Sequence, residues 1–147
     1  RPEQETPGEL VPPSELSRRL PEADFVVTTV PHTPETEGMW NTVRFRAMKD
    51  SAYFINIGRG MTAKLDDLVT ALEQGEIAGA GLDVFETEPL PDGHPLWNME
   101  NVLITPHIAV ADAEDIPERR FTLILENASH LIDGGAFVNV VDKKKWY

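Results

Sequence analysis

Three residues of this chain have the types that acid–base chemistry on a small anion requires. Arg59 stands between two glycines in Asn-Ile-Gly-Arg-Gly at 56–60, Glu88 is followed by a proline, and His107 is preceded by Thr-Pro. A guanidinium matches a carboxylate with a planar pair of donors, and an imidazole beside a carboxylate can give or take a proton near neutral pH. Together these groups could hold a 2-keto acid and move a proton on or off its oxygen.

The elements that must position these residues alternate along the chain. Apolar, β-branched stretches with the length of buried strands occur at 24–30, 52–57, 78–84 and 102–105. Helical patterns occur at 14–20, with Ser14 as the expected N-cap, and at 42–48, 65–74 and 116–132. This alternation predicts an α/β fold with a doubly wound parallel sheet, right-handed crossovers and helices on both faces.

Ligands of such sheets bind beyond the carboxyl ends of the strands. The loops at 31–38, 58–60, 86–91 and 106–109 should therefore share one edge of the sheet, and all three candidate residues lie in these loops. The long C-terminal helix should carry one apolar stripe and end at Gly134, and the stripe consists of Phe121, Ile124, Leu125, Ala128, Leu131 and Ile132.

Composition disfavours several classes of protein, among them nucleic-acid-binding and membrane-spanning proteins. The 147 residues carry a formal net charge of −12, which disfavours binding to nucleic acid or to anionic lipid. The chain has no cysteine and no apolar run long enough to span a membrane, so we expect a soluble cytoplasmic protein. No histidines have metal-ligand spacing, and we expect no metal site.

Four segments in the correct order resemble the D-isomer-specific 2-hydroxyacid dehydrogenases, which include glyoxylate/hydroxypyruvate reductases, D-lactate dehydrogenases and 3-phosphoglycerate dehydrogenases. The segments are Val-Pro-His-Thr-Pro-Glu-Thr at 30–36, Phe-Ile-Asn-Ile-Gly-Arg-Gly at 54–60, Gly-Ala-Gly-Leu-Asp-Val-Phe-Glu-Thr-Glu-Pro-Leu at 79–90, and Asn-Val-Leu-Ile-Thr-Pro-His-Ile-Ala at 101–109. The resemblance covers about residues 16–142 and implies the later half of a Rossmann-like doubly wound parallel sheet plus the long C-terminal return helix.

The resemblance implies an NAD- or NADP-dependent oxidoreductase that interconverts a 2-keto acid and a D-2-hydroxy acid. Arg59 would bind the substrate carboxylate, His107 would act as general acid and base, and Glu88 would pair with the imidazole and favour its protonated form. A homodimer is also implied. The positions expected to contact the cofactor are Val30 and Pro31 on the adenine side, Thr36 near the ribose or phosphate, the backbone of Ile57, Gly58 and Arg59, Asp83 at the carboxamide, and His107 and Ala109 near the nicotinamide.

The chain departs from the family pattern in two ways. Many relatives continue His-x-Ala-Gly where this chain has His-Ile-Ala-Val at 107–110, and the first βαβ unit with its glycine turn is missing. We therefore expect a fragment of a longer enzyme, with a connector at 1–13, a partial NAD(P)-binding domain at 14–110, and a return helix and tail at 111–147 that belong to the substrate-binding domain. Without the early strands, Phe121, Ile124 and Leu125 should be partly unpartnered.

Several alternatives stay open at the level of sequence. Glu86 competes with Glu88 for the partner of His107, and Asp83 could anchor a turn instead of contacting a cofactor. Formate dehydrogenases share the fold that the resemblance implies, but they typically place Gln where Glu88 stands. The chain could also be a catalytically silent remnant, or a dinucleotide-responsive scaffold of the kind found among corepressors that resemble these enzymes.

Overall fold

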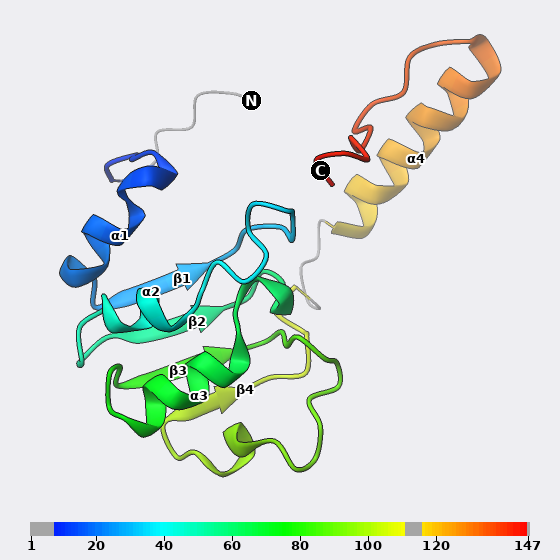
Figure 1. Cartoon of the computed structure of the whole chain (residues 1–147). Helices are drawn as coiled ribbons and strands as arrows, with labels where there is room; N and C mark the ends of the chain where they lie inside the picture. The colour runs from blue at the N-terminus through cyan, green and yellow to red at the C-terminus, as the bar shows by residue number, and fades with distance from the viewer. Residues whose placement is uncertain (1–7, 111–115, 147) are drawn as a thin grey trace.

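Four parallel strands form one sheet, with helices between them (Figure 1). The computed structural model describes residues 8–110 and 116–146. The strands are hydrogen-bonded in the order β1-β2-β3-β4, and each neighbouring pair is parallel. The strands are β1 Phe25–Thr28, β2 Tyr53–Asn56, β3 Gly79–Leu82 and β4 Val102–Ile104; the α-helices are α1 Leu16–Arg19, α2 Thr42–Arg46, α3 Leu65–Glu73 and α4 Ile116–Asp133; short 3-10 helices occupy Pro13–Glu15, Leu20–Glu22, Gly60–Thr62 and Pro95–Asn98.

The predicted α/β class, the parallel sheet and the long C-terminal helix are confirmed. Each strand is shorter than the apolar run that predicted it, because pairing stops where the chain turns into the loops. The helix expected at 14–20 is divided among two 3-10 turns and α1. The residue preceding the first turn is Pro12, and no side chain caps this turn, so the expectation of Ser14 as N-cap is wrong.

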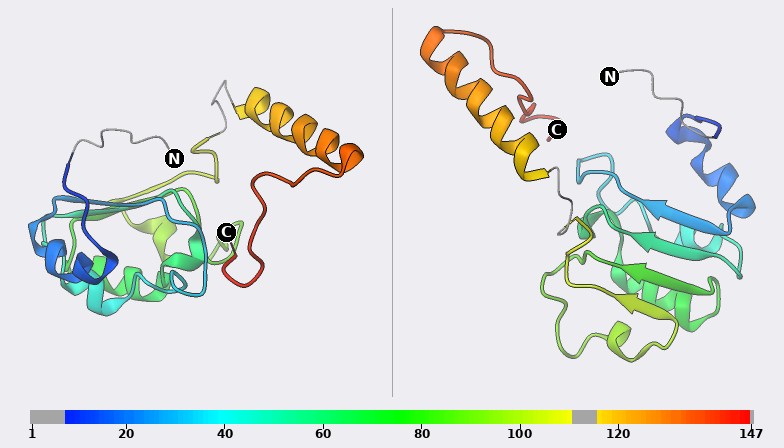
Figure 2. Two further views of the ribbon diagram at one scale, coloured as in Figure 1. Left: turned by 90° about the horizontal axis from the view of Figure 1, so that it is seen from above. Right: turned by 180° about the vertical axis from the view of Figure 1, so that it is seen from behind.

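The core lies between the sheet and the helices α2 and α3, which cover the same face (Figure 2). Phe54 of β2 is fully buried, with its ring centroid 5.2 Å from that of Phe45 in α2 and 5.1 Å from that of Trp40. Leu68 on the apolar stripe of α3 is also fully buried. Alternate residues of β1 and β2 point into this core, which gives each strand a half-buried pattern.

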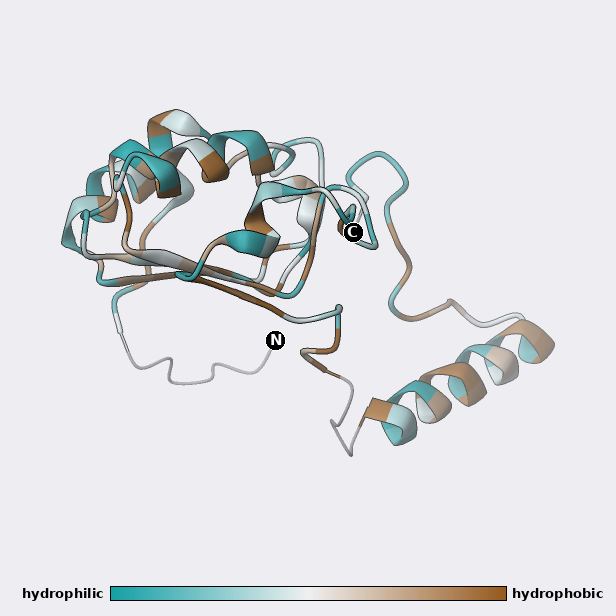
Figure 3. Cartoon of the chain, turned by 90° about the horizontal axis from the view of Figure 1, so that it is seen from below, coloured by the Kyte–Doolittle hydropathy of each residue, from teal (hydrophilic) through white to brown (hydrophobic). Residues whose placement is uncertain are grey.

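The opposite face of the sheet is open in the described structure. Phe25 and Val27 of β1 are 66% and 53% exposed, and Leu103 of β4 is 70% exposed. Hydrophobic residues along the strands and along α4 are brown in Figure 3. The expectation of helices on both faces is therefore wrong for the described residues, because no described helix packs against this second face. The apolar character of β1 fits a sheet covered on both faces, but the described helices cover only one of them.

Hydrogen bonds at the helix ends explain where α2 and α3 begin. The side chain of Asn41 accepts from the first-turn amides of α2. Lys64 precedes α3 and provides no side-chain cap; instead Glu86, from the loop after β3, accepts from the Leu65 amide at 2.7 Å. Gly75 has φ +67°, a left-handed conformation that ends α3.

Helix α4 stands apart from the sheet in Figures 1 and 2, and none of its described residues is buried. Phe121, Ile124 and Leu125 are 61%, 67% and 57% exposed, so the prediction that these residues are partly unpartnered is confirmed. The tail runs back along α4, where Asn127 exchanges two hydrogen bonds with the backbone of Val138. Among the described helices, none has the length and apolarity to cross a membrane.

Candidate active site

The candidate residues lie in the loops that follow the carboxyl ends of three adjacent strands. Arg59 follows β2, Glu88 lies in the loop after β3, and His107 follows β4. Because parallel strands end at the same edge of a sheet, the topology brings these three loops together. The edge predicted from the sequence therefore exists.

The turn after β2 presents Arg59 to solvent. Asn56 at the end of β2 is 1% exposed; its Oδ1 accepts from the Gly58 amide at 3.1 Å, and its Nδ2 donates to the Arg59 carbonyl oxygen at 3.3 Å. The same carbonyl accepts from the buried hydroxyl of Thr62 at 2.6 Å. The buried side-chain amide of Asn56 thus fixes the backbone at Gly58 and Arg59, a role that the sequence did not reveal.

The two glycines beside Arg59 are required by close backbone contacts. A Cβ on Gly58 would lie 2.7 Å from the Val30 carbonyl oxygen, and a Cβ on Gly60 would lie 1.8 Å from the carbonyl oxygen of Phe85. Any side chain at either position would force the loops apart. Arg59 itself is exposed, and its guanidinium donates to the Gly58 carbonyl oxygen at 2.7 Å.

His107 and Glu88 form a direct pair. The distance from His107 Nδ1 to Glu88 Oε2 is 2.8 Å, and the other oxygen of Glu88 accepts from the Phe85 amide at 3.0 Å. Both carboxylate oxygens are therefore engaged, which fixes the orientation of the carboxylate toward the ring. The second ring nitrogen, Nε2, has no hydrogen-bond partner among the described residues, and the His107 side chain is 45% exposed.

The environment of Glu88 favours its ionised form. Burial raises the pKa of this carboxyl, but hydrogen bonds from His107 and from the Phe85 amide, together with the charges of His107 and Arg59, outweigh burial and leave the pKa below its ordinary value.

Glu86 and Glu88 have different partners. Glu86 accepts from the first amide of α3, at Leu65, whereas Glu88 contacts His107. Of the two acids that the sequence left in competition, the geometry therefore pairs Glu88 with the imidazole and assigns Glu86 to the start of a helix.

Asp83 lies directly after β3, and its side chain is enclosed by the loop that carries His107. Its Oδ1 accepts from the Thr105 hydroxyl at 2.5 Å and from the Ile108 amide at 2.8 Å, and its Oδ2 accepts from the Ala109 amide at 2.9 Å. Asp83 is 3% exposed. Burial raises the pKa of its carboxyl, but these three hydrogen bonds and the charge of His107 more than compensate, so the pKa lies below its usual range. Thr105 is a second contributor to which the sequence analysis gave no role.

The remaining predicted cofactor positions lie along the same edge. Val30 and Pro31 follow β1, and the Thr36 hydroxyl donates to the Pro31 carbonyl oxygen at 2.7 Å, which closes the loop between them. Ile57 is 44% exposed and offers an apolar side chain next to Arg59. Among the described residues, none of these four forms a hydrogen bond with the His107 side chain.

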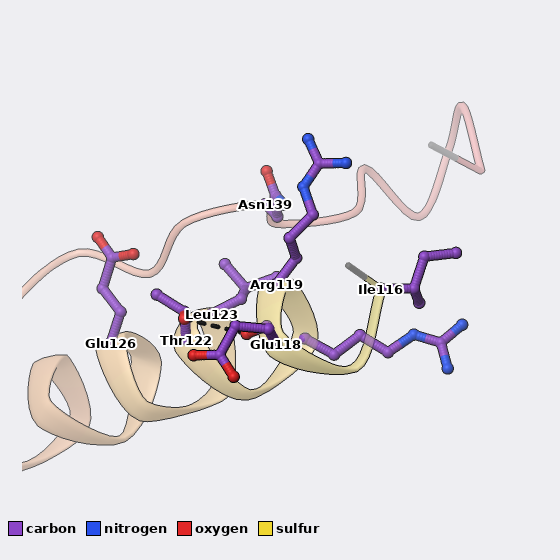
Figure 4. Close-up of a pocket in the computed structure, with 8 residues that line it drawn as sticks. Ile116, Glu118, Arg119, Thr122, Leu123, Glu126 and Asn139 are labelled. Atoms are coloured by element: carbon purple, nitrogen blue, oxygen red, sulfur yellow. Dashed lines mark hydrogen bonds between the residues drawn. The ribbon is translucent and has the colours of Figure 1, made fainter. Parts of the chain in front are cut away.

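A pocket of about 540 Å³ adjoins the His107–Glu88 pair. The pocket is lined mostly by apolar residues, and Arg59 does not line it. The lining residues are Phe85, Glu88, Pro89, Leu90, Trp97, Ile104, Thr105, Pro106 and His107. A second hollow, of about 580 Å³, lies on α4 where the tail passes at Asn139 (Figure 4). Its lining residues belong to α4 and the tail, so it is separate from the pair.

Within residues 8–110 and 116–146, no group of three or more His, Cys, Asp or Glu side chains is arranged to hold a metal ion. The candidate residues at the edge of the sheet instead provide the guanidinium of Arg59, the carboxylates of Asp83 and Glu88, both with lowered pKa values, and the imidazole of His107. This set can bind an anionic carbonyl compound and exchange a proton with it.

The family profile described as D-isomer specific 2-hydroxyacid dehydrogenase, NAD binding domain, matches residues 1–109. Among curated proteins, the chain is 44% identical over 118 residues to glyoxylate/hydroxypyruvate reductase A of Serratia proteamaculans, covering 80% of this chain and 37% of that protein. It is 45% identical over 119 residues to glyoxylate/hydroxypyruvate reductase B of Salmonella paratyphi B, covering 81% of this chain and 36% of the relative. The chain thus spans little more than a third of the length of these relatives.

Solved structures of similar fold cover most of this chain. A D-isomer specific 2-hydroxyacid dehydrogenase from Xanthobacter autotrophicus, in complex with NADPH and MES, matches with a TM-score of 0.82 and 41% identity, covering 92% of this chain and 43% of that one. The NADPH-dependent glyoxylate/hydroxypyruvate reductase from Sinorhizobium meliloti, in complex with NADP and sulfate, matches with a TM-score of 0.79 and 34% identity, covering 92% of this chain and 43% of that one. The chain belongs to the family of D-isomer specific 2-hydroxyacid dehydrogenases and carries part of their NAD-binding domain.

Proposed function

We propose that this chain carries the catalytic residues of an NAD(P)-dependent oxidoreductase that interconverts a 2-keto acid and a D-2-hydroxy acid. The observation that supports this most strongly is the 2.8 Å contact between His107 Nδ1 and Glu88, at the sheet edge that also carries Arg59. Glyoxylate and hydroxypyruvate, the compounds named for the relatives, are the first substrates to test.

Each of the three residues has a distinct task in this mechanism. Arg59 binds the substrate carboxylate with paired N–H donors and draws electron density from the keto oxygen. Glu88 accepts the Nδ1–H of His107, which leaves Nε2 to face that oxygen. In reduction, the protonated imidazole gives its Nε2 proton to the oxygen; in oxidation, the neutral imidazole takes the proton from the hydroxyl. A bound nicotinamide cofactor would supply or accept the hydride.

The edge of the sheet fits a nicotinamide dinucleotide in its donor and acceptor groups. A carboxylate oxygen offers two lone pairs, and Asp83 Oδ2 accepts one hydrogen bond, so one acceptor position remains for a carboxamide N–H. The residues proposed to contact the cofactor are those predicted from the sequence: Val30, Pro31, Thr36, Ile57, Gly58, Arg59, Asp83, His107 and Ala109. The complexes of related structures with NADPH and NADP support a cofactor of this class, either NAD or NADP. We also propose that the protein is a homodimer in the cytoplasm and that residues 111–147 belong to a substrate-binding domain.

The test measures oxidation of NADPH and of NADH by glyoxylate and hydroxypyruvate, with the protein at the length at which its cell produces it. We expect turnover, and we expect His107→Ala and Arg59→Ala each to reduce it at least about a hundredfold, because each removes a group that contacts the substrate. Wild-type rates in either variant would refute the mechanism.

A second function remains in competition because the sheet face and α4 are unpartnered in the described residues. A dinucleotide-responsive scaffold would bind NADPH, seen as a change in cofactor fluorescence, without turnover of any keto acid. A silent remnant would show neither binding nor turnover.

A further inference from the structure

The backbone of His107 adopts a conformation that non-glycine residues avoid. Its φ is +56°, in the left-handed region, where a Cβ crowds the backbone. Such a conformation persists only where the surrounding structure holds it, and it is found most often at functional sites. Something in this fold must therefore fix the loop on either side of His107.

The carboxylate of Asp83 contacts the loop on both sides of that residue. It accepts from the hydroxyl of Thr105, which lies two positions before His107, and from the amides of Ile108 and Ala109, which follow it. No other hydrogen bond joins a described side chain to these two amides. Asp83 itself is fixed to the sheet, because its amide donates to the carbonyl oxygen of Asn56 at the end of β2 at 3.0 Å.

We infer that Asp83 is a positioning residue for His107: its carboxylate binds the loop at Thr105, Ile108 and Ala109 and so holds the imidazole against Glu88. This inference rests on the proposed function of His107 as proton donor. It assigns Asp83 a task in the protein without cofactor, in addition to the proposed contact with the carboxamide. Asp83 acts through the loop and needs no contact with the substrate.

The first experiment observes the His107 ring by 15N NMR in the purified chain without nicotinamide cofactor. In the wild type, the proton on Nδ1 should be visible because Glu88 holds it. Asp83→Asn keeps the size of the side chain but turns an NH2 group toward one of the three donors. We expect this variant to lose the Nδ1–H signal and to exchange the Ile108 and Ala109 amides about tenfold faster or more.

The control is Asp50→Asn, which removes the same charge from an exposed turn before β2. It should leave both readouts unchanged, which separates loss of the three hydrogen bonds from loss of one negative charge. An unchanged Nδ1–H signal and unchanged amide exchange in a folded Asp83→Asn variant would overturn the inference.

A milder pair of variants decides the question if Asp83→Asn does not fold. Thr105→Val keeps the shape of the side chain and removes only the hydroxyl donor, whereas Thr105→Ser restores a hydroxyl. We expect a weakened Nδ1–H signal in Thr105→Val and recovery in Thr105→Ser. Equal signals in the two variants would contradict the inference. Because neither readout requires turnover, failure of the proposed enzyme activity would not be mistaken for failure of this positioning role.

Discussion

Residues 16–110, here called the sheet body, and helix α4 with its tail differ in how their apolar residues are used. The fully buried hydrophobic residues of the described chain all lie within Leu20–Leu96, whereas α4 buries none of its residues. Both α3 and α4 carry an apolar stripe, yet α3 buries its stripe and α4 does not. An amphipathic pattern thus predicts a helix and its apolar face, but not the presence of the surface that covers this face.

The candidate active site belongs entirely to the sheet body. Arg59, Glu88 and His107 are held by hydrogen bonds among loops that the core of the sheet supports. Helices in proteins gain most of their stability from packing of an apolar face, and α4 buries none of its described residues. The contrast predicts that substitutions in the two regions have very different effects.

The largest effect on stability should come from the core of the sheet body. Phe54→Ala removes a fully buried ring that packs against Phe45 and Trp40, and we expect a loss of about 3–5 kcal/mol in the free energy of unfolding. Ile124→Ala, on the exposed stripe of α4, should change that free energy by about 0.5 kcal/mol or less. Chemical denaturation of both variants measures the difference. Equal losses would show that α4 is packed against the chain in solution.

The next effect should come from the turn that carries Arg59. Gly60→Ala places a Cβ on the backbone of Phe85, and we expect a loss of about 1–3 kcal/mol because the loops must move apart. The matched control is Gly93→Ala, where a Cβ meets no atom within 4 Å and φ is not in the left-handed region. Thermal unfolding compares the two. A Gly60→Ala variant as stable as Gly93→Ala would contradict the close contact between these loops.

Substitution of Glu88 should lower the reaction rate, whereas substitution of Glu86, in the same loop after β3, should affect mainly stability. Glu88→Gln should lower the rate of keto-acid reduction roughly tenfold to a hundredfold, because the imidazole loses the carboxylate that orients it. Glu86→Gln should leave this rate nearly unchanged and should weaken only the start of α3. Steady-state rates under one set of conditions compare the variants. A fully active Glu88→Gln enzyme would show that Glu88 does not act on His107.

The smallest effect should be the pH dependence of stability. Asp83 and Glu88 both have folded-state pKa values below their ordinary values, so the unfolded chain binds more protons than the folded chain as the pH falls. Their contribution is fully present above about pH 5 and is lost as the pH falls through about pH 4 toward the folded-state values. Urea denaturation at several pH values should show this loss, and Asp83→Asn should show a shallower acid dependence. An identical acid dependence in this variant would contradict the lowered pKa of Asp83.

Much of the fold could be predicted from the sequence because local patterns determine it. The apolar runs that became β1 to β4 and the stripes of α3 and α4 are readable without the structure. The open face of the sheet was not predictable from β1, since its residues have the composition of a strand covered on both sides. Burial depends on which other surfaces are present, and the composition of one strand does not report that.

Some residues of the candidate site could likewise be predicted from the sequence, and others could not. Arg59, Glu88 and His107 stand out because their residue types and flanking Gly and Pro are unusual. The roles of Asn56 and Thr105 were missed, since a buried amide or hydroxyl at the end of a strand shows its partners only in three dimensions. The choice between Glu86 and Glu88 also required geometry, because the two acids are separated by a single residue.

The roles of His107 and Arg59 are tested most directly by identifying the product that the protein, at its native length, forms from hydroxypyruvate and NADPH. We expect D-glycerate in an amount equal to the NADPH consumed, and none with His107→Ala. Binding of NADPH without any glycerate, or formation of L-glycerate, would contradict this expectation.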